Sequence, residues 1–156
     1  MQKITPFLWF NGQAEEAMHF YTSVFPNARV GDVTRYGEAG PGPKGSVMSC
    51  TFELEGQEFF ALNGGPMFQF SPAISFFVKC RTQDEVDALW DKLAAGGRVQ
   101  QCGWLQDKFG VSWQIVPTVL GEMLHDKDPA KSRRVMEAMM KMVKLDIAEL
   151  EKAYRG

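Results

Sequence analysis

The sequence contains few residues of the kinds that build metal centres and disulfides. Its 156 residues include only 3 cysteines and 2 histidines. The cysteines, Cys50, Cys80 and Cys102, are widely separated and include no CxxC pair, so the sequence predicts neither a disulfide framework nor a zinc site. Isolated reduced thiols are typical of cytoplasmic proteins, and we expect that location here.

Long apolar runs and an excess of charge of one sign are also absent. No stretch approaches the roughly 20 apolar residues of a membrane span, and residues 1–6 do not resemble a secretory signal, so we expect a soluble protein without a membrane partner. The net charge of −2 provides no broad basic field, which argues against nucleic-acid binding. The apolar content of 45% is typical of a globular domain with a real core.

The usual nucleotide-binding and hydrolytic motifs are missing too. The glycine-rich segment 37–45 lacks the GK[ST] ending of a P-loop and precedes a strand pattern, so it is interpreted as a loop. Neither a GxSxG nor an HExxH motif occurs. Cys102 is the best isolated nucleophile, but no neighbouring base would activate its thiol, and a structural role is favoured.

What the sequence does contain is an internal repeat. Residues 4–30, ITPFLWFNGQAEEAMHFYTSVFPNARV, align without a gap with residues 73–99, AISFFVKCRTQDEVDALWDKLAAGGRV. Each copy opens with a short apolar, aromatic-rich run typical of a buried strand and continues into an amphipathic helix with an acidic start. Thr82 and Glu85 have the spacing of a capping box for the second helix.

Three strand-like runs follow each predicted helix. They cover residues 29–36, 46–55 and 57–63 in the first half, and residues 98–102, 104–108 and 111–117 in the second. Tight turns are expected at Glu55-Gly56 and Phe109-Gly110. The sequence therefore predicts an α+β protein with two tandem βαβββ modules.

The last 38 residues follow a different pattern. A short helix is predicted over 119–124, and Asp128-Pro129 is a strong start for a second, with a methionine-rich apolar stripe that favours core or dimer packing. We expect a single domain over residues 1–156, with module one at 1–70, module two at 71–118 and a helical tail at 119–156.

Several of these segments resemble one known family. The stretches ITPFLWFNGQAEEAMHFYTSVFPNARV, FALNGGP, SPAISFFVKC and QCGWLQDKFGVSWQIVPTVL, together with the tail, are similar to PhnB-like proteins, also described as the 3-demethylubiquinone-9 3-methyltransferase domain. That family belongs to the glyoxalase/bleomycin resistance/dioxygenase (vicinal oxygen chelate) superfamily. The resemblance implies paired modules that form an incomplete barrel with a concave pocket, usually in a homodimer. Whether modules pair within one chain or between two stays open.

The resemblance also implies where a metal would bind. Active members of the superfamily hold a divalent ion through His, Glu or Gln side chains on the first and last strands of each module. The matching first strands, residues 4–8 and 73–77, contain no His, Asp, Glu or Cys, and the last strands offer only the amides of Asn63 and Gln114. His19 and His125 are interpreted as a helix-surface residue and a tail residue. We therefore expect no cofactor.

The other strand and loop residues predict a pocket with aromatic walls and a few polar groups, which is typical of small-molecule sites. Met67 stands where the family resemblance leads us to expect His. The candidate ligand-binding residues are Thr5, Trp9, Asn63, Met67, Phe70, Ser75, Trp104, Trp113 and Gln114, with no catalytic residue assigned.

Three functional hypotheses follow. The leading one is a metal-independent protein that binds a small, partly aromatic or apolar molecule. The alternative is a divergent isomerase, lyase or dioxygenase-type enzyme whose divalent metal is held by Gln114, Asn63 and water. The third is an S-adenosylmethionine-dependent methyltransferase, which would need a glycine-rich turn between a strand and a helix. Whether the protein is an enzyme stays open at this point.

Overall fold

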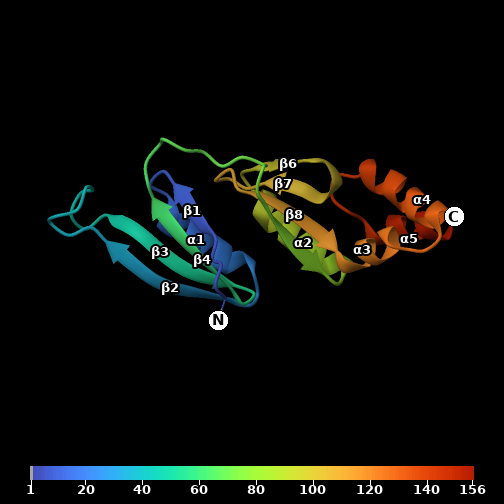
Figure 1. Cartoon of the computed structure of the whole chain (residues 1–156), viewed down its shortest axis with the longest axis horizontal. Helices are drawn as coiled ribbons and strands as arrows, with labels where there is room; N and C mark the ends of the chain where they lie inside the picture. The colour runs from blue at the N-terminus through green and yellow to red at the C-terminus, as the bar shows by residue number, and fades with distance from the viewer. Residues whose placement is uncertain (1) are drawn as a thin grey trace. The chain divides into compact units, whose positions relative to one another are not determined.

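The computed structural model describes residues 2–156 and divides the chain into two compact units, the first ending at Phe70 and the second running from Ser71 to Gly156 (Figure 1). Each unit contains one four-stranded mixed sheet and a helix that follows its first strand. The predicted fold class, α+β with two βαβββ modules and C-terminal helices, is confirmed.

The first unit orders its sheet as β1-β4-β3-β2, with β1 parallel to β4 and the other pairs antiparallel. Its elements are β1 (Phe7–Phe10), α1 (Ala14–Val24), β2 (Ala28–Arg35), β3 (Val47–Leu54) and β4 (Gln57–Asn63). The connection between β3 and β4 is the expected two-residue turn, with φ of 49° at Glu55 and 85° at Gly56. Positive φ at both central residues matches the right-handed twist of the flanking strands.

Helix α1 covers one face of this sheet because its apolar residues recur at helical spacing. Ala14, Ala17, Met18 and Tyr21 are completely buried, and the Tyr21 ring lies 5.9 Å from that of Phe52 on β3. The other face of the sheet has no helix of this unit against it.

The second unit repeats this plan with the sheet order β5-β8-β7-β6. Helix α2 contacts β5, β7 and β8. The elements are β5 (Ser75–Cys80), α2 (Gln83–Ala94), β6 (Arg98–Val99), a 3₁₀ turn η1 (Gln101–Gly103), β7 (Trp104–Gln106) and β8 (Ser112–Pro117).

The start of α2 follows the predicted capping pattern in part. The Thr82 hydroxyl accepts a hydrogen bond from the backbone N–H of Glu85, as a capping box requires. The Glu85 carboxylate accepts from the N–H of Arg81 rather than from that of Thr82. On the inner face of α2, Val86, Leu89, Trp90 and Leu93 are buried, as their spacing predicts.

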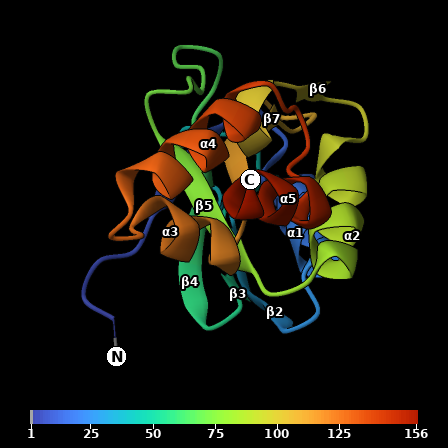
Figure 2. The same ribbon diagram turned by 90° about the vertical axis from the view of Figure 1, so that its right-hand side faces the viewer.

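Three helices complete the second unit: α3 (Thr118–Leu124), α4 (Pro129–Met140) and α5 (Ile147–Arg155), which pack together in Figure 2. Asp128 caps α4 by accepting from the N–H of Ala130. The Arg134 guanidinium donates to the last carbonyls of α5, those of Ala153 and Tyr154. Their shared core contains Val116, Leu120, Met123, Val135, Leu145 and Leu150.

The tail is joined to the sheet by backbone hydrogen bonds. The N–H groups of Cys102 and Gly103 donate to the carbonyls of Met142 and Val143, each at 2.8 Å. Because these N–H groups donate to the tail, they do not take part in the hydrogen bonding between β6 and β7. The predicted strand over 98–102 is therefore wrong beyond Val99, and Cys102 instead has a left-handed conformation with φ of 60°.

The first strand of each module also begins later than predicted. Strand β1 starts at Phe7 rather than Ile4, and β5 starts at Ser75 rather than Ala73 and extends to Cys80. Strand β5 is longer because its parallel partner β8 stays in register to the pair Cys80 and Pro117. Within residues 2–156, every helix is too short or too polar to cross a bilayer.

Candidate ligand-binding face of the second sheet

Side chains on the β5-β8-β7-β6 sheet alternate between two faces. Trp113, Ile115 and Leu105 are buried on the face that α2 covers. Their neighbours along the strands therefore point to the opposite side, which we call the open face. It carries Ser75, Phe77, Lys79, Arg98, Trp104, Gln106, Ser112 and Gln114. At the end of β8, Val116 also lies on this side, next to Lys79, but it is buried in the core of the tail helices.

The strand register arranges the open face in two rows. One row crosses all four strands, since Ser112 pairs with Ser75 and Gln106, and Gln106 pairs with Arg98. Residues paired in this way lie side by side on one face of a sheet. The second row consists of Phe77, Gln114 and Trp104. A polar row therefore lies next to a row with two aromatic rings.

Two hydrogen bonds fix the amides of the open face. Gln114 Nε2 donates to Ser75 Oγ at 3.0 Å, and Arg98 Nη2 donates to Gln106 Oε1 at 3.0 Å. Because a guanidinium can only donate, the oxygen of the Gln106 amide must face Arg98. The Gln106 amide nitrogen and the Gln114 amide oxygen are then directed away from these bonds.

Ser112 is the unusual member of the polar row. Its side chain is 1% exposed, and its hydroxyl has no hydrogen-bond partner within residues 2–156. A buried hydroxyl without a partner costs free energy that a water molecule or a ligand atom would recover. The open face thus contains one hydroxyl whose hydrogen-bonding capacity is unused.

The aromatic row is partly accessible. Phe77 is 54% exposed and Trp104 is half-buried, on either side of Gln114. Flat aromatic side chains beside an amide offer both an apolar contact and a hydrogen bond to a small molecule.

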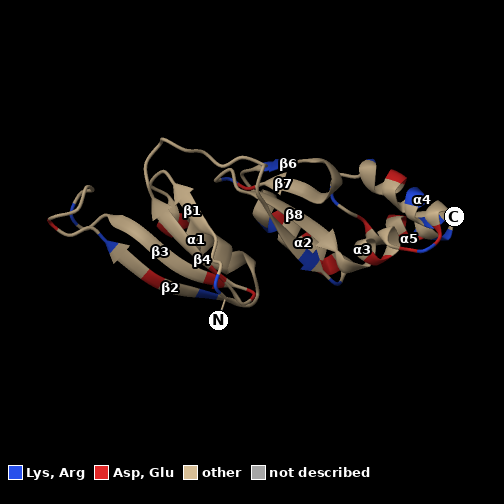
Figure 3. Ribbon diagram, viewed as in Figure 1, with Lys and Arg blue, Asp and Glu red and all other residues tan. Residues whose placement is uncertain are grey.

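The charges on this face are of one sign. Lys79 and Arg98 are its charged residues, and it carries no carboxylate. Figure 3 shows that elsewhere acidic and basic residues are interspersed along the chain. The open face therefore favours an anionic or neutral ligand over a cationic one.

Three of the predicted site residues lie together here. Ser75, Trp104 and Gln114 are neighbours on the open face, and Ser75 and Gln114 are hydrogen-bonded. Trp113 lies on the other face, 2% exposed, where its indole N–H donates to Asp107 Oδ2 at 2.9 Å and its ring contacts that of Phe76. Trp113 therefore serves the core beneath α2 rather than the open face.

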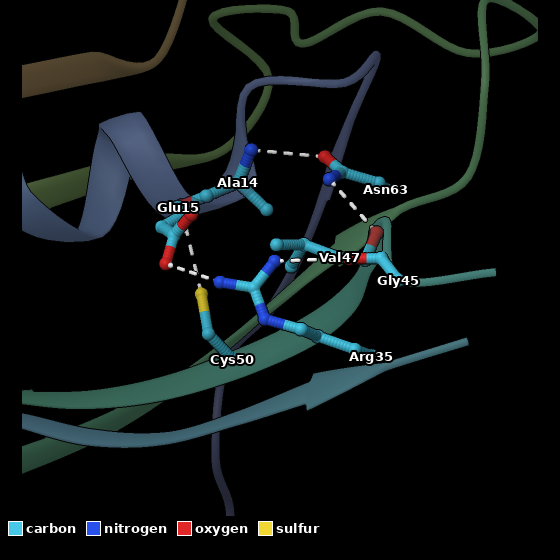
Figure 4. Close-up of polar contacts among 7 residues, drawn as sticks. All are labelled: Ala14, Glu15, Arg35, Gly45, Val47, Cys50 and Asn63. Atoms are coloured by element: carbon cyan, nitrogen blue, oxygen red, sulfur yellow. Dashed lines mark hydrogen bonds and ion pairs between the residues drawn. The ribbon is translucent and has the colours of Figure 1, made fainter. Parts of the chain in front are cut away.

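Asn63 also has a structural position. Its Oδ1 accepts from the N–H of Ala14 at the start of α1, and its Nδ2 donates to the carbonyl of Val47 on β3 (Figure 4). In the β1–β4 ladder it pairs with the buried Phe10, on the side that α1 covers. Both ends of this amide are occupied in holding the first helix to the sheet.

The other predicted residues belong to the first unit. Thr5 precedes β1 and donates to Glu58 at 3.4 Å, while the Trp9 indole N–H donates to the Gly65 carbonyl and its ring meets Phe68 edge-on. Phe70 packs edge-on against Phe10. Met67 is 77% exposed in the segment after β4.

The first unit has a groove of its own, of about 770 Å³, at the N-terminus of α1. Its walls include Glu15, Glu16, Tyr36, Ser46 and Asn63. One wall is tied together by Arg35, which forms an ion pair with Glu15 and donates to the Gly45 carbonyl (Figure 4). In this groove, the side chains of Glu15, Ser46 and Asn63 already have hydrogen-bond or ion-pair partners within the first unit.

The open face offers poor ligands for a divalent metal. Within residues 2–156, no three His, Cys, Asp or Glu side chains gather as a ligand set. On the open face, the available oxygens are neutral, and the positive charges of Lys79 and Arg98 would oppose a bound cation. In the hypothesis of a metal-dependent enzyme, Asn63 is the other protein ligand, but its side-chain oxygen already accepts from the N–H of Ala14 at the start of α1.

Sequence reasoning missed Arg98, Gln106 and Ser112. Ser112 lies two residues before Gln114 on the same strand, so the period of two along a strand was a signal that could have found it. Arg98 and Gln106 join the row only through the register of β6 and β7, which the sequence does not encode locally.

Comparison with known proteins agrees with this architecture. A family model described as 3-demethylubiquinone-9 3-methyltransferase matches residues 2–116. A PhnB protein from Bacillus cereus, whose description also names 3-demethylubiquinone-9 3-methyltransferase, is 44% identical over 75% of this chain and 100% of its own, with a TM-score of 0.70. No curated protein matches the sequence.

More distant structures share the fold alone. Protein PA1353 from Pseudomonas aeruginosa is 23% identical over 75% of this chain and 98% of its own, with a TM-score of 0.59. The fosfomycin resistance protein FosX from Listeria monocytogenes, crystallised with Mn(II) and sulfate, is 14% identical over 72% of this chain and 90% of its own, with a TM-score of 0.52.

The repeated βαβββ units and these likenesses define an α+β protein that shares its fold with the Bacillus cereus PhnB protein and with FosX. Within that class, the chain belongs to the 3-demethylubiquinone-9 3-methyltransferase (PhnB-like) family. The family match ends at residue 116, so the resemblance expected for the tail is not part of it.

Proposed function

We propose that this PhnB-like protein binds a small organic molecule on the open face of its second sheet without a metal ion. The observation that carries the proposal is the meeting of Ser75, Gln114 and Trp104 on the face opposite to the one that α2 covers. The Gln114 amide oxygen would accept a hydrogen bond from the ligand, and Phe77 and Trp104 would contact its apolar part.

The donors of the open face support metal-independence. Neutral amide and hydroxyl oxygens hold a divalent ion weakly unless carboxylates accompany them, and here two cationic side chains share the face. The alternative of a divergent metal-dependent isomerase, lyase or dioxygenase would require ligands from outside this row.

Methyl transfer, which the family's description names, finds less support in the fold. Proteins with a doubly wound parallel sheet bind dinucleotide-type cofactors at a glycine-rich turn between a strand and a helix. Here each sheet is mixed, and the glycine-rich segment 37–45 connects two antiparallel strands, β2 and β3.

We also propose that the protein acts as a homodimer. In each unit the helix of the βαβββ module covers only one sheet face, and large apolar side chains such as Phe7 and Phe77 are more than half exposed on the other. Exposed apolar groups gathered on a sheet face are typical of interaction surfaces. Light scattering should give the mass of two chains, and the mass of one chain would contradict the proposal.

The remaining partner expectations belong to the same proposal. Small molecules, rather than nucleic acids, are the ligands that an open face of this mixed polarity suits. The three cysteines are free, which fits the reducing conditions of the cytoplasm.

A fragment screen observed by NMR tests the binding function. Small aromatic and alicyclic compounds would be added to ¹⁵N-labelled protein in the presence of EDTA, with the Trp104 indole signal assigned through Trp104→Phe. We expect several compounds to shift the Trp104 indole and Gln114 amide signals saturably. Gln114→Ala should weaken the binding of these compounds about tenfold, which corresponds to about 1.4 kcal/mol.

Gln57→Ala provides the matched control, because Gln57 lies on β4 of the first unit and donates only to a neighbouring carbonyl. It should leave every affinity unchanged. If no compound moves the signals of the open face, or if Gln114→Ala changes nothing, the proposed function is wrong.

A further inference from the structure

The polar row of the open face shows a consistent direction of hydrogen bonding. Arg98 donates to Gln106 Oε1, which leaves the Gln106 amide nitrogen available as a donor to a ligand. Adjacent strands are about 4.8 Å apart, so the Gln106 amide is close enough to share a ligand atom with either neighbour. From Arg98 to Ser112 the row therefore presents N–H and O–H donors.

Arg98 is well placed to act on a ligand rather than on the protein. Its hydrogen bond to Gln106 keeps the guanidinium over β7, and residues 2–156 include no ion pair to it. A guanidinium has five N–H donors, and the bond to Gln106 uses one of them. Most of its donors therefore have no protein partner in the described part of the chain.

Ser112 gives an independent indication of a ligand atom. Its hydroxyl is the buried side-chain polar atom without a partner in the described part of the chain, and it lies in the middle of the row. Neither of its ladder neighbours uses it, since Gln106 bonds Arg98 and Ser75 accepts from Gln114. An acceptor atom from outside the protein would satisfy it.

The electrostatic contrast between the two sheets points the same way. The corresponding face of the first sheet carries Glu53 and Glu58 against one Arg29, and Arg29 is already paired with Glu53. The open face of the second sheet carries two cations and no carboxylate. An anion would thus be attracted to the second sheet although the whole chain has a net charge of −2.

We infer that the open face selects a small carboxylate with an aromatic or apolar body. The carboxylate lies over the polar row, accepting from Ser112, Gln106 and Arg98, and the body lies against Phe77 and Trp104. A planar carboxylate suits this row because its two oxygens can accept from neighbouring donors at once, as in an arginine fork. The inference rests on the proposed binding function and adds the chemical class of the ligand.

Benzoate and benzamide form a matched pair of probes, since they share a ring and a planar head group but differ in charge. Each would be titrated into ¹⁵N-labelled protein containing EDTA, while the Trp104 indole and the Gln106 and Gln114 side-chain amides are followed. We expect saturable shifts with benzoate and at least about tenfold weaker binding of benzamide.

Variants then assign the preference to the row. Arg98→Gln should lower benzoate affinity about tenfold and leave benzamide unchanged, whereas Arg98→Lys should retain part of the preference because it keeps the charge. Ser112→Ala should lower the affinity for benzoate as well. Arg29→Gln removes an equal charge from the first sheet and should have no effect on either probe.

The inference is overturned if benzamide binds as tightly as benzoate, if neither probe binds, or if Arg98→Gln leaves both affinities unchanged. These results differ from failure of the proposed function. If the proposed function fails, no compound of any charge shifts the signals of the open face. If only the preference for a carboxylate fails, neutral compounds from the fragment screen still shift them. Inorganic phosphate, added as a competitor, should displace benzoate poorly, and efficient displacement would contradict the choice of a carboxylate.

Discussion

At the scale of single residues, Ser112 combines complete burial with an unused hydroxyl. Burying a polar group without a hydrogen bond costs stability, so a protein keeps such a group where function repays the cost. Ser112 would therefore be a residue that binding favours and folding does not.

We predict that Ser112→Ala raises the stability of the ligand-free protein by about 1 kcal/mol, because it removes an unpartnered buried hydroxyl. Urea denaturation should show a higher midpoint with an unchanged slope. Ser75→Ala is the comparison, since it breaks an existing bond from Gln114 and should lower the midpoint. Equal destabilisation by both variants would show that Ser112 has a partner after all.

The cysteines carry a second prediction at this scale. Burial, with a smaller contribution from Glu15, raises the pKa of Cys50 to about 11, and burial with Glu85 raises that of Cys80 to about 12. Both thiols stay protonated at pH 8. Iodoacetamide should then modify at most Cys102 in the folded protein and all three cysteines in urea, as intact mass would show.

The same raised pKa values predict how stability changes with pH. Below pH 9 these thiols are protonated in both states, so their contribution to stability is fully present, whereas above pH 9 they ionise more readily in the unfolded chain. Their contribution is therefore lost as pH rises from 9 toward 12. The stability difference between wild type and Cys80→Ala should shrink over this range, and a constant difference would contradict the assignment.

At the scale of elements, the tail depends on one close approach. A Cβ at Gly103 would lie 2.9 Å from Leu145 Cδ1 and 3.0 Å from the Ile115 carbonyl oxygen, and the φ of Gly103 is 83°. Only glycine satisfies both the conformation and the space at this position. The segment that leads into α5 can thus pack directly on the sheet.

We predict that Gly103→Ala lowers stability by about 2 kcal/mol or more and loosens α4 and α5, because both strain and overlap oppose the side chain. Hydrogen exchange should become faster in the tail helices. Gly121→Ala in α3 is the control, since nothing lies within 4 Å of the added Cβ. It should stabilise the helix slightly; unchanged exchange in Gly103→Ala would contradict this account of the tail.

How far the sequence predicts these elements depends on how local their causes are. The stripe from Ala14 to Tyr21, the cap at Thr82 and the start at Asp128-Pro129 were predicted because each depends on residues a few positions apart. The end of β6 could not be predicted, since it depends on tail carbonyls some 40 residues away that accept from Cys102 and Gly103. Gln114 was identified through the family resemblance and Ser75 as an inward-facing strand residue, whereas Arg98 required the register between strands.

At the scale of the whole molecule, the two units use the same topology for different surfaces. In the first unit, two candidate ligand-binding residues have structural roles: Asn63 is hydrogen-bonded to Ala14 and Trp9 to Gly65. The second keeps an amide, a hydroxyl and a guanidinium on a face without carboxylates. A repeat can in this way retain one fold while its copies acquire separate roles.

This difference has a direct consequence for metal binding, the property on which the alternative enzyme hypothesis depends. A binding face with two cations and neutral donors should not retain a divalent ion. The most direct measurement is the metal content of untagged protein, purified without chelator, equilibrated with Mn²⁺, Ni²⁺ and Zn²⁺ and freed of unbound ions, determined by elemental mass spectrometry. The account predicts far less than one ion per chain, unchanged in Gln114→Ala. About one ion per chain, lost in Gln114→Ala, would contradict it and identify the open face as a metal centre.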